Sequence, residues 1–358
     1  MLQRNSYGGR ITVSKNTLSI IIPTSGSGPF IFECLASIAK LAGSPFIGEI
    51  LLVVNGSQNK LGAEDYERFL DAQTSQVANK FRVIHEPVPG LLAGRHRGAA
   101  EATGLFLSFI DDDVVLGDDW ARSVEELCVS GTLSHRIAGG SVSPDFRGPT
   151  PSWLSKLSID LPRQGTVMSE LSLISISGDQ AREISPLFVF GLNFTVTKEA
   201  LYDLGGFSPD LTPQKLLRFR GNGETAVAEE LISRGEKAIW HPGLSTRHII
   251  GTERLNLRYL CKIWIRQGIS EQFQAIKKNY ALETFGGINV LGTTRQLVSK
   301  SQRILGSNIG TSRGKALGFL RLVCLWGGKN FLWHQYRKDR RVKEWIQREN
   351  YFDYAYPA

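Results

Sequence analysis

The sequence predicts an α/β fold, in which a mostly parallel sheet flanked by helices is followed by a helical C-terminal extension. Over the first hundred residues, short apolar runs alternate with segments of helical periodicity, the pattern of parallel strands joined by crossover helices. Beyond about residue 251 the chain reads as helical and basic. The 358 residues suffice for one large α/β domain with an extension, or for two ordinary domains.

Four apolar runs are predicted to be buried strands: TLSIIIPT (17–24), EILLVVNGS (49–57), FRVIHEP (81–87) and LFLSFIDDDV (105–114). Helices are expected over about 30–42 and over GRHRGAAEATG, which ends at Gly104. Ligands of open sheets bind beyond the carboxyl ends of the strands. Three of those ends carry polar residues here: Thr24 and Ser25; Asn55, Gly56 and Ser57; Asp111, Asp112 and Asp113.

From about 138 to 250 the pattern changes to short strands, turns and a few helices. ALYDLGGF and TAVAEELISRG are predicted to be helices that end at glycines, and KAIWHP a short strand. We therefore expect three parts: a leader over 1–16, an α/β domain over 17–250 and a basic helical region over 251–358.

The cysteine usage predicts a reduced, cytoplasmic compartment. The four cysteines are far apart and form no CxxC pair, so neither a zinc cluster nor a disulfide framework is expected. The start, MLQRNSYGGRITVSKN, lacks the apolar core of a secretory signal. The run ALGFLRLVCLWGG is interrupted by Arg321 and is too short to span a bilayer, so no transmembrane anchor is expected.

The formal net charge of +8 is concentrated towards the C-terminus. Basic charge of this kind serves nucleic acid, anionic lipid or phosphate-bearing substrates. Composition does not choose among these partners.

The triplet Asp111, Asp112 and Asp113 is the strongest local signal. Side chains alternate along an extended strand end, so Asp111 and Asp113 are expected to face one side and Asp112 the other. Two carboxylates that close repel unless a cation lies between them, and hard oxygen ligands select Mg²⁺ or Mn²⁺. The alternative is a solvated acidic turn or the N-cap of the next helix.

Two further residues carry chemistry in this sequence. Glu224, in RGNGETAVAEEL, follows a glycine-rich loop at a predicted helix start, where it can approach a substrate; the alternative is first-turn charge that the helix dipole favours. His248, in STRHII, lies just past a short strand, and a lone histidine is more often structural.

Five motifs over 17–250 together resemble family 2 glycosyltransferases, whose catalytic domain has the GT-A fold. The last of them is followed by His248. In order, they are SIIIPT, EILLVVNGS, PGLLAGRHRGAAEATGLFLSFIDDDV, FGLNFTVTKEALYDLGGFSPDL and GETAVAEELISRGEKAIWHP. Each motif is weak alone, but their order and spacing make the set specific. About a hundred C-terminal residues stay outside the resemblance.

The resemblance implies a role for each matching position. Asp113 would bind the metal that holds the donor diphosphate, with Asp111 beside it on the ribose or the metal shell and His248 near both. Arg95 would contact the nucleotide. Glu224 would be the catalytic base. The donor-binding positions also include the following: Pro23, Thr24, Asn55 and Asp112.

The mechanism that the resemblance implies is a single inverting displacement with Mn²⁺ or Mg²⁺ and a nucleoside-diphosphate sugar as donor. A sugar hydroxyl is a poor nucleophile at neutral pH, so a positioned base is required. The diphosphate leaves as a polyanion, so a cation is required too. A glycan or lipid-linked glycan is the acceptor that the family leads us to expect.

The chain departs from the family pattern in two places. The strand that contacts the nucleobase commonly has an acidic pair, where this chain has Val54 and Asn55, so the identity of the base is open. The acid that often precedes the catalytic one is Gly223. We keep Glu224 as the base, with Asp210 as the fallback.

Three other classes of protein compete with this interpretation. A nucleotidyltransferase should have a basic glycine-rich loop after its first strand, but PTSGSGPF has no basic residue. A Rossmann dehydrogenase lacks support because no GxGxxG joins a strand to a helix. A catalytically degenerate sugar-nucleotide-fold protein that docks on membranes stays open. No nucleic-acid partner is expected.

The C-terminal region interleaves aromatic and basic residues. Such mixtures suit an interfacial helix that brings a cytoplasmic enzyme to the inner, anionic face of a membrane. The alternative is a helical cap whose aromatic residues pack inward. The residues concerned are Tyr259, Trp264, Trp326, Trp333, Arg254, Arg258, Lys262, Arg266, Arg321 and Lys329.

Overall fold

The computed structural model describes most of the chain as two compact units. The described residues are 18–26, 28–56, 63–134, 136–161, 164–208, 223–278 and 312–347, with the paired backbone of β1 (Gln3–Arg4) and β2 (Arg10–Ile11). Unit 1 comprises those within 1–145, 176–207 and 223–249, and unit 2 those within 146–175, 208–222 and 250–358.

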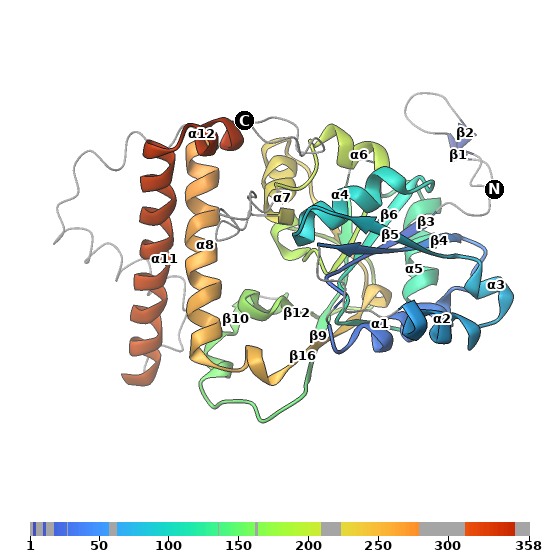
Figure 1. Cartoon of the computed structure of the whole chain (residues 1–358), viewed down its shortest axis with the longest axis horizontal. Helices are drawn as coiled ribbons and strands as arrows, with labels where there is room; N and C mark the ends of the chain where they lie inside the picture. Colours follow the sequence, from blue (N-terminus) through green and yellow to red (C-terminus); the bar gives the residue numbers. More distant parts are fainter. Residues whose placement is uncertain are drawn as a thin grey trace. The chain divides into compact units, whose positions relative to one another are not determined.

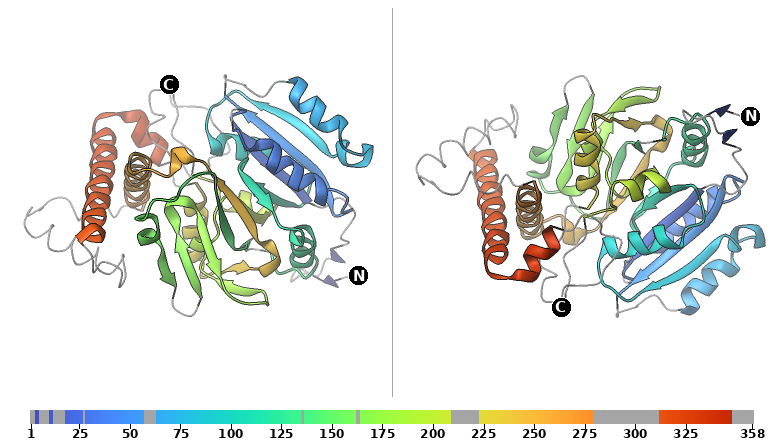
Figure 2. Two further views of the ribbon diagram at one scale, coloured as in Figure 1. Left: turned by 90° about the horizontal axis from the view of Figure 1, so that it is seen from below. Right: turned by 90° about the horizontal axis from the view of Figure 1, so that it is seen from above.

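The N-terminal strands of unit 1 form a parallel sheet, as predicted (Figures 1 and 2). The order is β6-β3-β4-β5, and each neighbouring pair is parallel. These strands are β3 (Leu18–Thr24), β4 (Ile47–Asn55), β5 (Phe81–Glu86) and β6 (Phe106–Ile110). Every residue of β3 and β6 is buried, which explains why both read as continuous apolar runs.

The other half of the large sheet is mixed. Its full order is β13-β15-β8-β14-β6-β3-β4-β5, and β14 runs antiparallel to both β6 and β8. The expectation of a mostly parallel sheet therefore holds for the N-terminal half. The added strands are β8 (Ile137–Gly139), β13 (Arg182–Ile184), β14 (Asn193–Thr197) and β15 (Ala238–Trp240).

A second group of strands in unit 1 lies in the order β9-β16-β7. β7 (Val114–Leu116) begins directly after the aspartate triplet and pairs antiparallel with β16 (Thr246–Ile250), so that Val114 lies opposite His248. β9 (Val142–Phe146) completes the group. This pairing brings two segments more than a hundred residues apart in sequence to one place.

Helices connect and cover the strands of unit 1. The predicted helices are present as α1 (Ile31–Leu41) and α4 (Leu91–Glu101), and α4 packs on β3 and β4. The remaining helices of this unit are α2 (Ala63–Asp71), α3 (Ser75–Ala78), α5 (Trp120–Val129), α6 (Lys198–Asp203), α7 (Gly223–Ser233), η3 (Pro186–Phe188) and η5 (Pro242–Leu244).

Unit 2 combines a small strand region with a helix pair. α8 (Leu257–Lys277) and α11 (Ser312–Lys338) pack together, and α12 (Arg340–Ile346) packs against both. The expected C-terminal helical region is thus present, and none of the described helices is long and apolar enough to cross a membrane. The other elements are β10 (Ile159–Leu161), β11 (Gly165–Met168), β12 (Leu173–Ile176), η1 (Leu154–Leu157), η2 (Ser169–Leu171) and η6 (Thr252–Arg254).

Glycines allow the closest approaches between elements. In unit 1, a Cβ on Gly98 of α4 would lie 2.3 Å from Ile21 Cγ2 on β3. In unit 2, Gly268 of α8 meets the backbone oxygen of Leu325, and Gly328 of α11 meets that of Ile265. All three approaches are closer than a Cβ atom allows, so these positions need glycine.

The contact at Gly98 yields a stability prediction. Gly98→Ala should lower the free energy of unfolding by about 1–3 kcal/mol, because the added methyl overpacks the buried face between α4 and β3. Thermal and urea unfolding followed by circular dichroism measure the change. Gly43→Ala is the matched control, since a Cβ at Gly43 would meet no atom within 4 Å. A loss of stability at Gly43 equal to that at Gly98 would contradict this account.

Candidate active site

The three aspartates each have a different partner. Asp111 Oδ1 accepts from Arg95 Nη2 at 2.8 Å, Asp112 Oδ2 accepts from Thr24 Oγ1 at 2.6 Å, and Asp113 Oδ2 lies 3.5 Å from His248 Nε2. The triplet occupies a turn between β6 and β7, in which the Val114 amide donates to the Asp111 carbonyl at 3.2 Å. The expected strand-like alternation of these side chains is therefore wrong, because a turn does not follow the two-residue period.

Arg95 joins two acidic residues that are far apart in sequence. Its side chain on α4 is 1% exposed, and Nη1 donates to Glu224 Oε2 at 3.2 Å while Nη2 donates to Asp111. Burial alone would lower the pKa of Arg95, but the two carboxylates outweigh it and the pKa is raised. Burial raises the pKa of Asp111, against the opposing effect of Arg95.

Glu224 is held from a second side by the backbone. The Gly191 amide donates to Glu224 Oε1 at 3.3 Å, and the Glu224 side chain remains 29% exposed. A Cβ at Gly191 would lie 2.4 Å from Arg95 Nη1, so only glycine leaves room for the guanidinium. Gly191 stands in the motif FGLNF, but nothing in the sequence alone indicated that this glycine has a role in the site.

Phe207 supports Arg95 through its aromatic ring. The Arg95 Cζ lies 5.5 Å from the centre of the fully buried Phe207 ring, within cation–π range. The Phe207 amide also donates to His96 Nε2 at 2.8 Å. Gly205 and Gly206, both with positive φ, bring the chain into this position after α6. The Gly-Gly-Phe motif therefore acts in this structure by positioning Arg95.

Asp113 and His248 form the second polar pair of the site. Asp113 is 8% and His248 4% exposed, and the Ile249 amide donates to the Asp113 carbonyl at 2.8 Å. A carboxylate oxygen and an imidazole nitrogen are both ligands that Mn²⁺ accepts. Within the described ranges, no group of three or more His, Cys, Asp or Glu side chains is arranged to hold a metal ion. An ion here would take its other ligands from substrate oxygens and water.

The ends of β3 and β4 meet the start of α4. Thr24 is buried and also accepts from the Gly26 amide at 3.0 Å, while Asn55 Nδ2 donates to the Gly90 carbonyl. A Cβ on Gly94 would lie 3.0 Å from Pro23 Cβ and 3.3 Å from Asn55 Nδ2. The predicted donor-binding residues of both strands thus lie close to α4. Their contact with a nucleotide stays a prediction.

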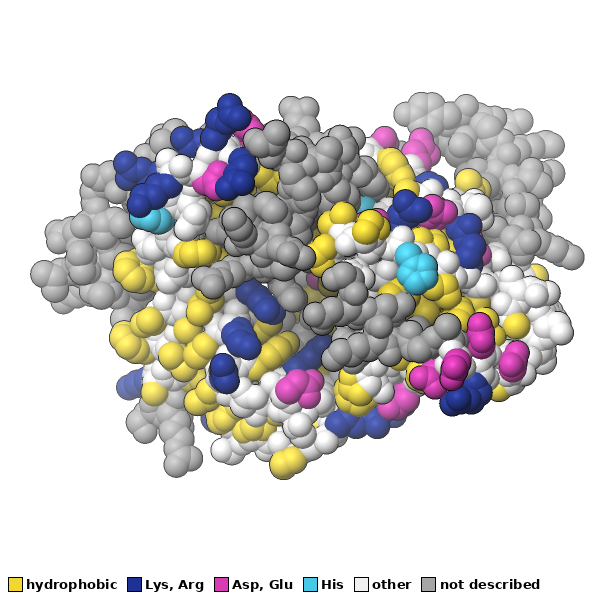
Figure 3. Space-filling model, in the orientation of Figure 1, with side chains coloured by type: hydrophobic (Ala, Val, Ile, Leu, Met, Phe, Trp, Pro, Cys, Tyr) yellow, Lys and Arg dark blue, Asp and Glu magenta, His cyan; other side chains and the backbone are white. Residues whose placement is uncertain are grey.

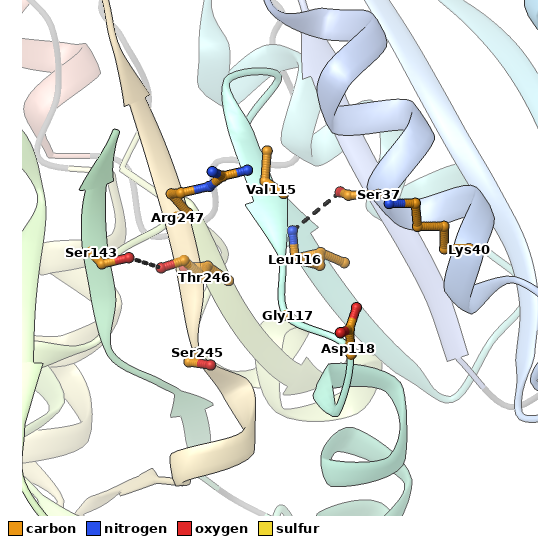
Figure 4. A pocket seen from close by; sticks show the side chains of 10 residues that line it. All are labelled: Ser37, Lys40, Val115, Leu116, Gly117, Asp118, Ser143, Ser245, Thr246 and Arg247. Carbon is orange, nitrogen blue, oxygen red and sulfur yellow. Dashed lines mark hydrogen bonds between the residues drawn. The ribbon is translucent and has the colours of Figure 1, made fainter. Parts of the chain in front are cut away.

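A polar cavity of about 350 Å³ is lined by residues of β7 and β16, next to the pair formed by Asp113 and His248 (Figure 4). Leu116 pairs with Thr246 across these strands, two positions along the ladder from the pair formed by Val114 and His248. The buried Thr246 Oγ1 has no hydrogen-bond partner among the described residues. The lining residues are Ser37, Lys40, Val115, Leu116, Gly117, Asp118, Ser143, Ser245, Thr246 and Arg247.

Two other acidic residues, Glu230 and the fallback base Asp210, bear on the assignment of Glu224. Glu230, one turn and a half further along α7, forms an ion pair with Arg234 at 2.8 Å and is not joined to Arg95. Asp210, the fallback base, lies outside the described residues. Glu224 therefore contacts Arg95 directly and is linked through Arg95 to Asp111.

Comparison with known proteins identifies this region. Residues 19–165, which contain Arg95 and the whole aspartate turn, match the family described as "Glycosyl transferase family 2". They form a family 2 glycosyltransferase domain. The match begins in β3 and ends at the start of β11, so the family 2 domain contributes most of the described site, and Glu224 and His248 come from the chain beyond it.

Individual relatives cover parts of the chain. The chain is similar to the uncharacterized glycosyltransferase EpsJ of Bacillus subtilis (strain 168), with 37% identity over 112 residues, 30% of each protein. It is also similar to the putative glycosyltransferase EpsH of the same organism, with 28% identity over 109 residues, 30% of this chain and 29% of that protein. The matched stretch therefore spans less than a third of these relatives.

Among solved structures, the chain also matches that of GalNAc-T7 with UDP, GalNAc and Mn²⁺. The TM-score is 0.46 at 14% sequence identity, over 79% of this chain and 54% of that chain.

The buried ion pairs of Arg95 yield the second prediction. Arg95→Met should lower the free energy of unfolding by about 2–3 kcal/mol, less than the 3–5 kcal/mol typical of fully buried pairs, because Asp111 and Glu224 keep some contact with water. Urea unfolding without added nucleotide or metal measures this change.

Arg97→Met is the control for Arg95→Met. Arg97 lies on the same helix, is 44% exposed and pairs with Glu101 at 2.7 Å, a contact of about 0.3–0.5 kcal/mol. If the two substitutions lowered the free energy of unfolding equally, the stabilising role given to the buried ion pairs of Arg95 would be wrong.

Proposed function

We propose that this chain transfers a sugar from a nucleoside-diphosphate sugar to a hydroxyl acceptor by a single inverting displacement. The observation that carries the proposal is the chain of contacts Glu224–Arg95–Asp111, formed at the aspartate turn of a family 2 domain. A partly exposed carboxylate that a buried cation holds from one side gives a positioned base beside the aspartate turn.

Glu224 is proposed as the base. Its carboxylate would accept the proton of the acceptor hydroxyl as that oxygen bonds to the anomeric carbon and the bond to the diphosphate oxygen breaks. The Gly191 amide and Arg95 fix one face of the carboxylate, and its 29% exposed fraction leaves the rest open to an acceptor. Fixing the base before the acceptor binds lowers the entropic cost of reaching the reactive geometry.

The strand ends and the aspartate turn are proposed to bind the donor nucleotide, and the buried Arg95 is proposed to act through Asp111. The Arg95 guanidinium, once a nucleotide is bound, would hold Asp111 in place for contact with the ribose. The other proposed donor contacts are Pro23, Thr24, Asn55 and Asp112. Support comes from their position, since all lie at the carboxyl ends of parallel strands or in the turn after one.

Asp113 and His248 are proposed to hold Mn²⁺ or Mg²⁺, with Asp111 beside them. The fit rests on the donor set: a carboxylate oxygen and an imidazole nitrogen 3.5 Å apart, both mostly buried. When bound, the ion would neutralise charge on the departing diphosphate. The pairing of Asp111 with Arg95 favours Asp113 and His248 as the direct ligands.

The acceptor is proposed to be a glycan or a lipid-linked glycan, with the enzyme attached peripherally to a membrane through residues 251–358. The exposed surface of unit 2, described below, supports attachment. The family match over 19–165 favours sugar transfer over nucleotidyl transfer.

A panel of sugar nucleotides tests the proposed reaction. Each is incubated with the protein and Mn²⁺, and the product is analysed. Release of a nucleoside diphosphate with sugar transfer is the expected result. Release of pyrophosphate would instead indicate a nucleotidyltransferase, and binding of every donor without turnover would indicate a catalytically degenerate protein.

Replacement of the base gives the third prediction. Glu224→Gln should lower kcat by about 10²–10⁴-fold with nucleotide affinity little changed, because the amide cannot accept the acceptor proton. Glu230→Gln, on the same helix, should retain wild-type kcat. Equal kcat for Glu224→Gln and the wild type would overturn the assignment of the base.

Metal dependence gives the fourth prediction. Asp113→Asn and His248→Gln should each weaken Mn²⁺-dependent donor binding by about tenfold or more, because each removes a proposed ligand. Isothermal titration with and without Mn²⁺ measures this, with Asp119→Asn, an exposed residue paired with Arg122, as control. Unchanged Mn²⁺ dependence in both variants would exclude this pair as the metal site.

A further inference from the structure

Helix α11 is apolar on two opposite faces. One face packs in unit 2 and contains the buried residues Leu317, Cys324 and Leu332. The opposite face, here called the outer face, consists of Phe319, Val323 and Trp326, which are 67%, 47% and 54% exposed. Their spacing of four and three residues places them on one side of the helix. A helix that faces water on one side normally has polar residues there.

The charges of α11 are all of one sign. Its 27 residues contain six lysines and arginines and no aspartate or glutamate. Arg321 pairs with the buried Glu170 and Lys329 pairs with Glu271, both within unit 2. Lys315, one turn before Phe319, is exposed, and so are Arg337 and Lys338 at the other end of the helix. The outer face therefore lies between exposed cations.

The face of unit 2 that Figure 3 shows is rich in apolar and basic side chains. Hydrophobic side chains gather along its helices, and lysines and arginines surround the C-terminal end of α11 and α12 (Figure 3). Exposed phenylalanine and tryptophan with flanking cations are the composition of a helix that lies in the interface of a bilayer, with its apolar side among the lipid chains.

We propose that the outer face of α11 docks on an anionic lipid surface. Phe319, Val323 and Trp326 enter the boundary of the acyl chains, and Lys315, Arg337 and Lys338 contact phosphate head groups. A second copy of the chain is the less suitable partner, because it would bring two helices without acidic residues together. Anionic lipid supplies the opposite charge.

Two other aromatic residues of the C-terminal region, Trp264 and Trp333, pack inside unit 2. Trp264 is fully buried and its indole donates to Glu170 Oε1 at 2.9 Å. Trp333 packs against the core cluster of unit 2, which includes Leu332 and Trp345. These two aromatic residues hold unit 2 together, and the interfacial role falls on Phe319 and Trp326.

This inference rests on the proposed function, because it describes the membrane partner suggested for the transferase. Lipid binding and sugar transfer are measured independently, so the failure of one is distinguishable from the failure of the other. The test uses the full chain and vesicles of phosphatidylcholine alone or with phosphatidylglycerol, separated by sedimentation. The wild type should bind the anionic vesicles, release from them as salt is raised, and bind the neutral vesicles weakly. Phe319→Ser with Trp326→Ser should reduce binding about tenfold or more.

Two further variants make the result specific. Leu105→Ser with Ile232→Ser removes apolar side chains of unit 1 that are 56% and 44% exposed, and should leave binding unchanged. Lys315→Gln with Arg337→Gln and Lys338→Gln should weaken binding to anionic vesicles and flatten its salt dependence. Donor turnover without vesicles should match the wild type in all three variants, which separates loss of docking from loss of the enzyme.

The proposal is overturned by any of three results. The wild type binds neither vesicle, the outer-face variant binds as well as the wild type, or size-exclusion chromatography shows a dimer that the outer-face variant converts to monomers. The last result would assign the outer face to a second copy of the chain.

Discussion

The site depends on one buried cation. Arg95 is almost fully removed from water, and a guanidinium in that position is stable only if acidic partners compensate for its lost hydration. Asp111 and Glu224 are those partners, so a single side chain fixes the turn after β6 and the start of α7 relative to α4. The same contacts hold the proposed base and the proposed ribose ligand at one place.

The surroundings of Arg95 explain why small and aromatic residues occur where they do. Gly191 leaves room for the guanidinium and also donates its amide to Glu224, and Phe207 lies against the guanidinium. Gly94 lets α4 approach the ends of β3 and β4. These residues have no proposed chemical role of their own, yet a side chain at Gly191 would meet the Arg95 guanidinium, and one at Gly94 would meet Pro23 and Asn55.

Unit 2 is held together by close helix packing and by one buried carboxylate. Its helices α8 and α11 approach closely at Gly268 and Gly328. The buried Glu170 carboxylate accepts a hydrogen bond from the Trp264 indole and forms an ion pair with Arg321. With these groups turned inward, α11 is left with an apolar outer face and exposed cations. The same helix thus stabilises the unit and provides the surface proposed for lipid.

The sequence by itself determined the α/β class, the N-terminal parallel strands, the C-terminal helices and the family resemblance, because these depend on local periodicity and on motif order. It also drew attention to Asp111, Asp113, Glu224 and His248, which stand next to strand ends and helix starts. Only the tertiary structure decided their partners. Arg95 and Glu224 are 129 positions apart, and no local pattern encodes which cation a carboxylate will meet. The turn geometry of the aspartates and the inward position of Trp264 were likewise set by packing between distant segments, which a one-dimensional pattern does not contain.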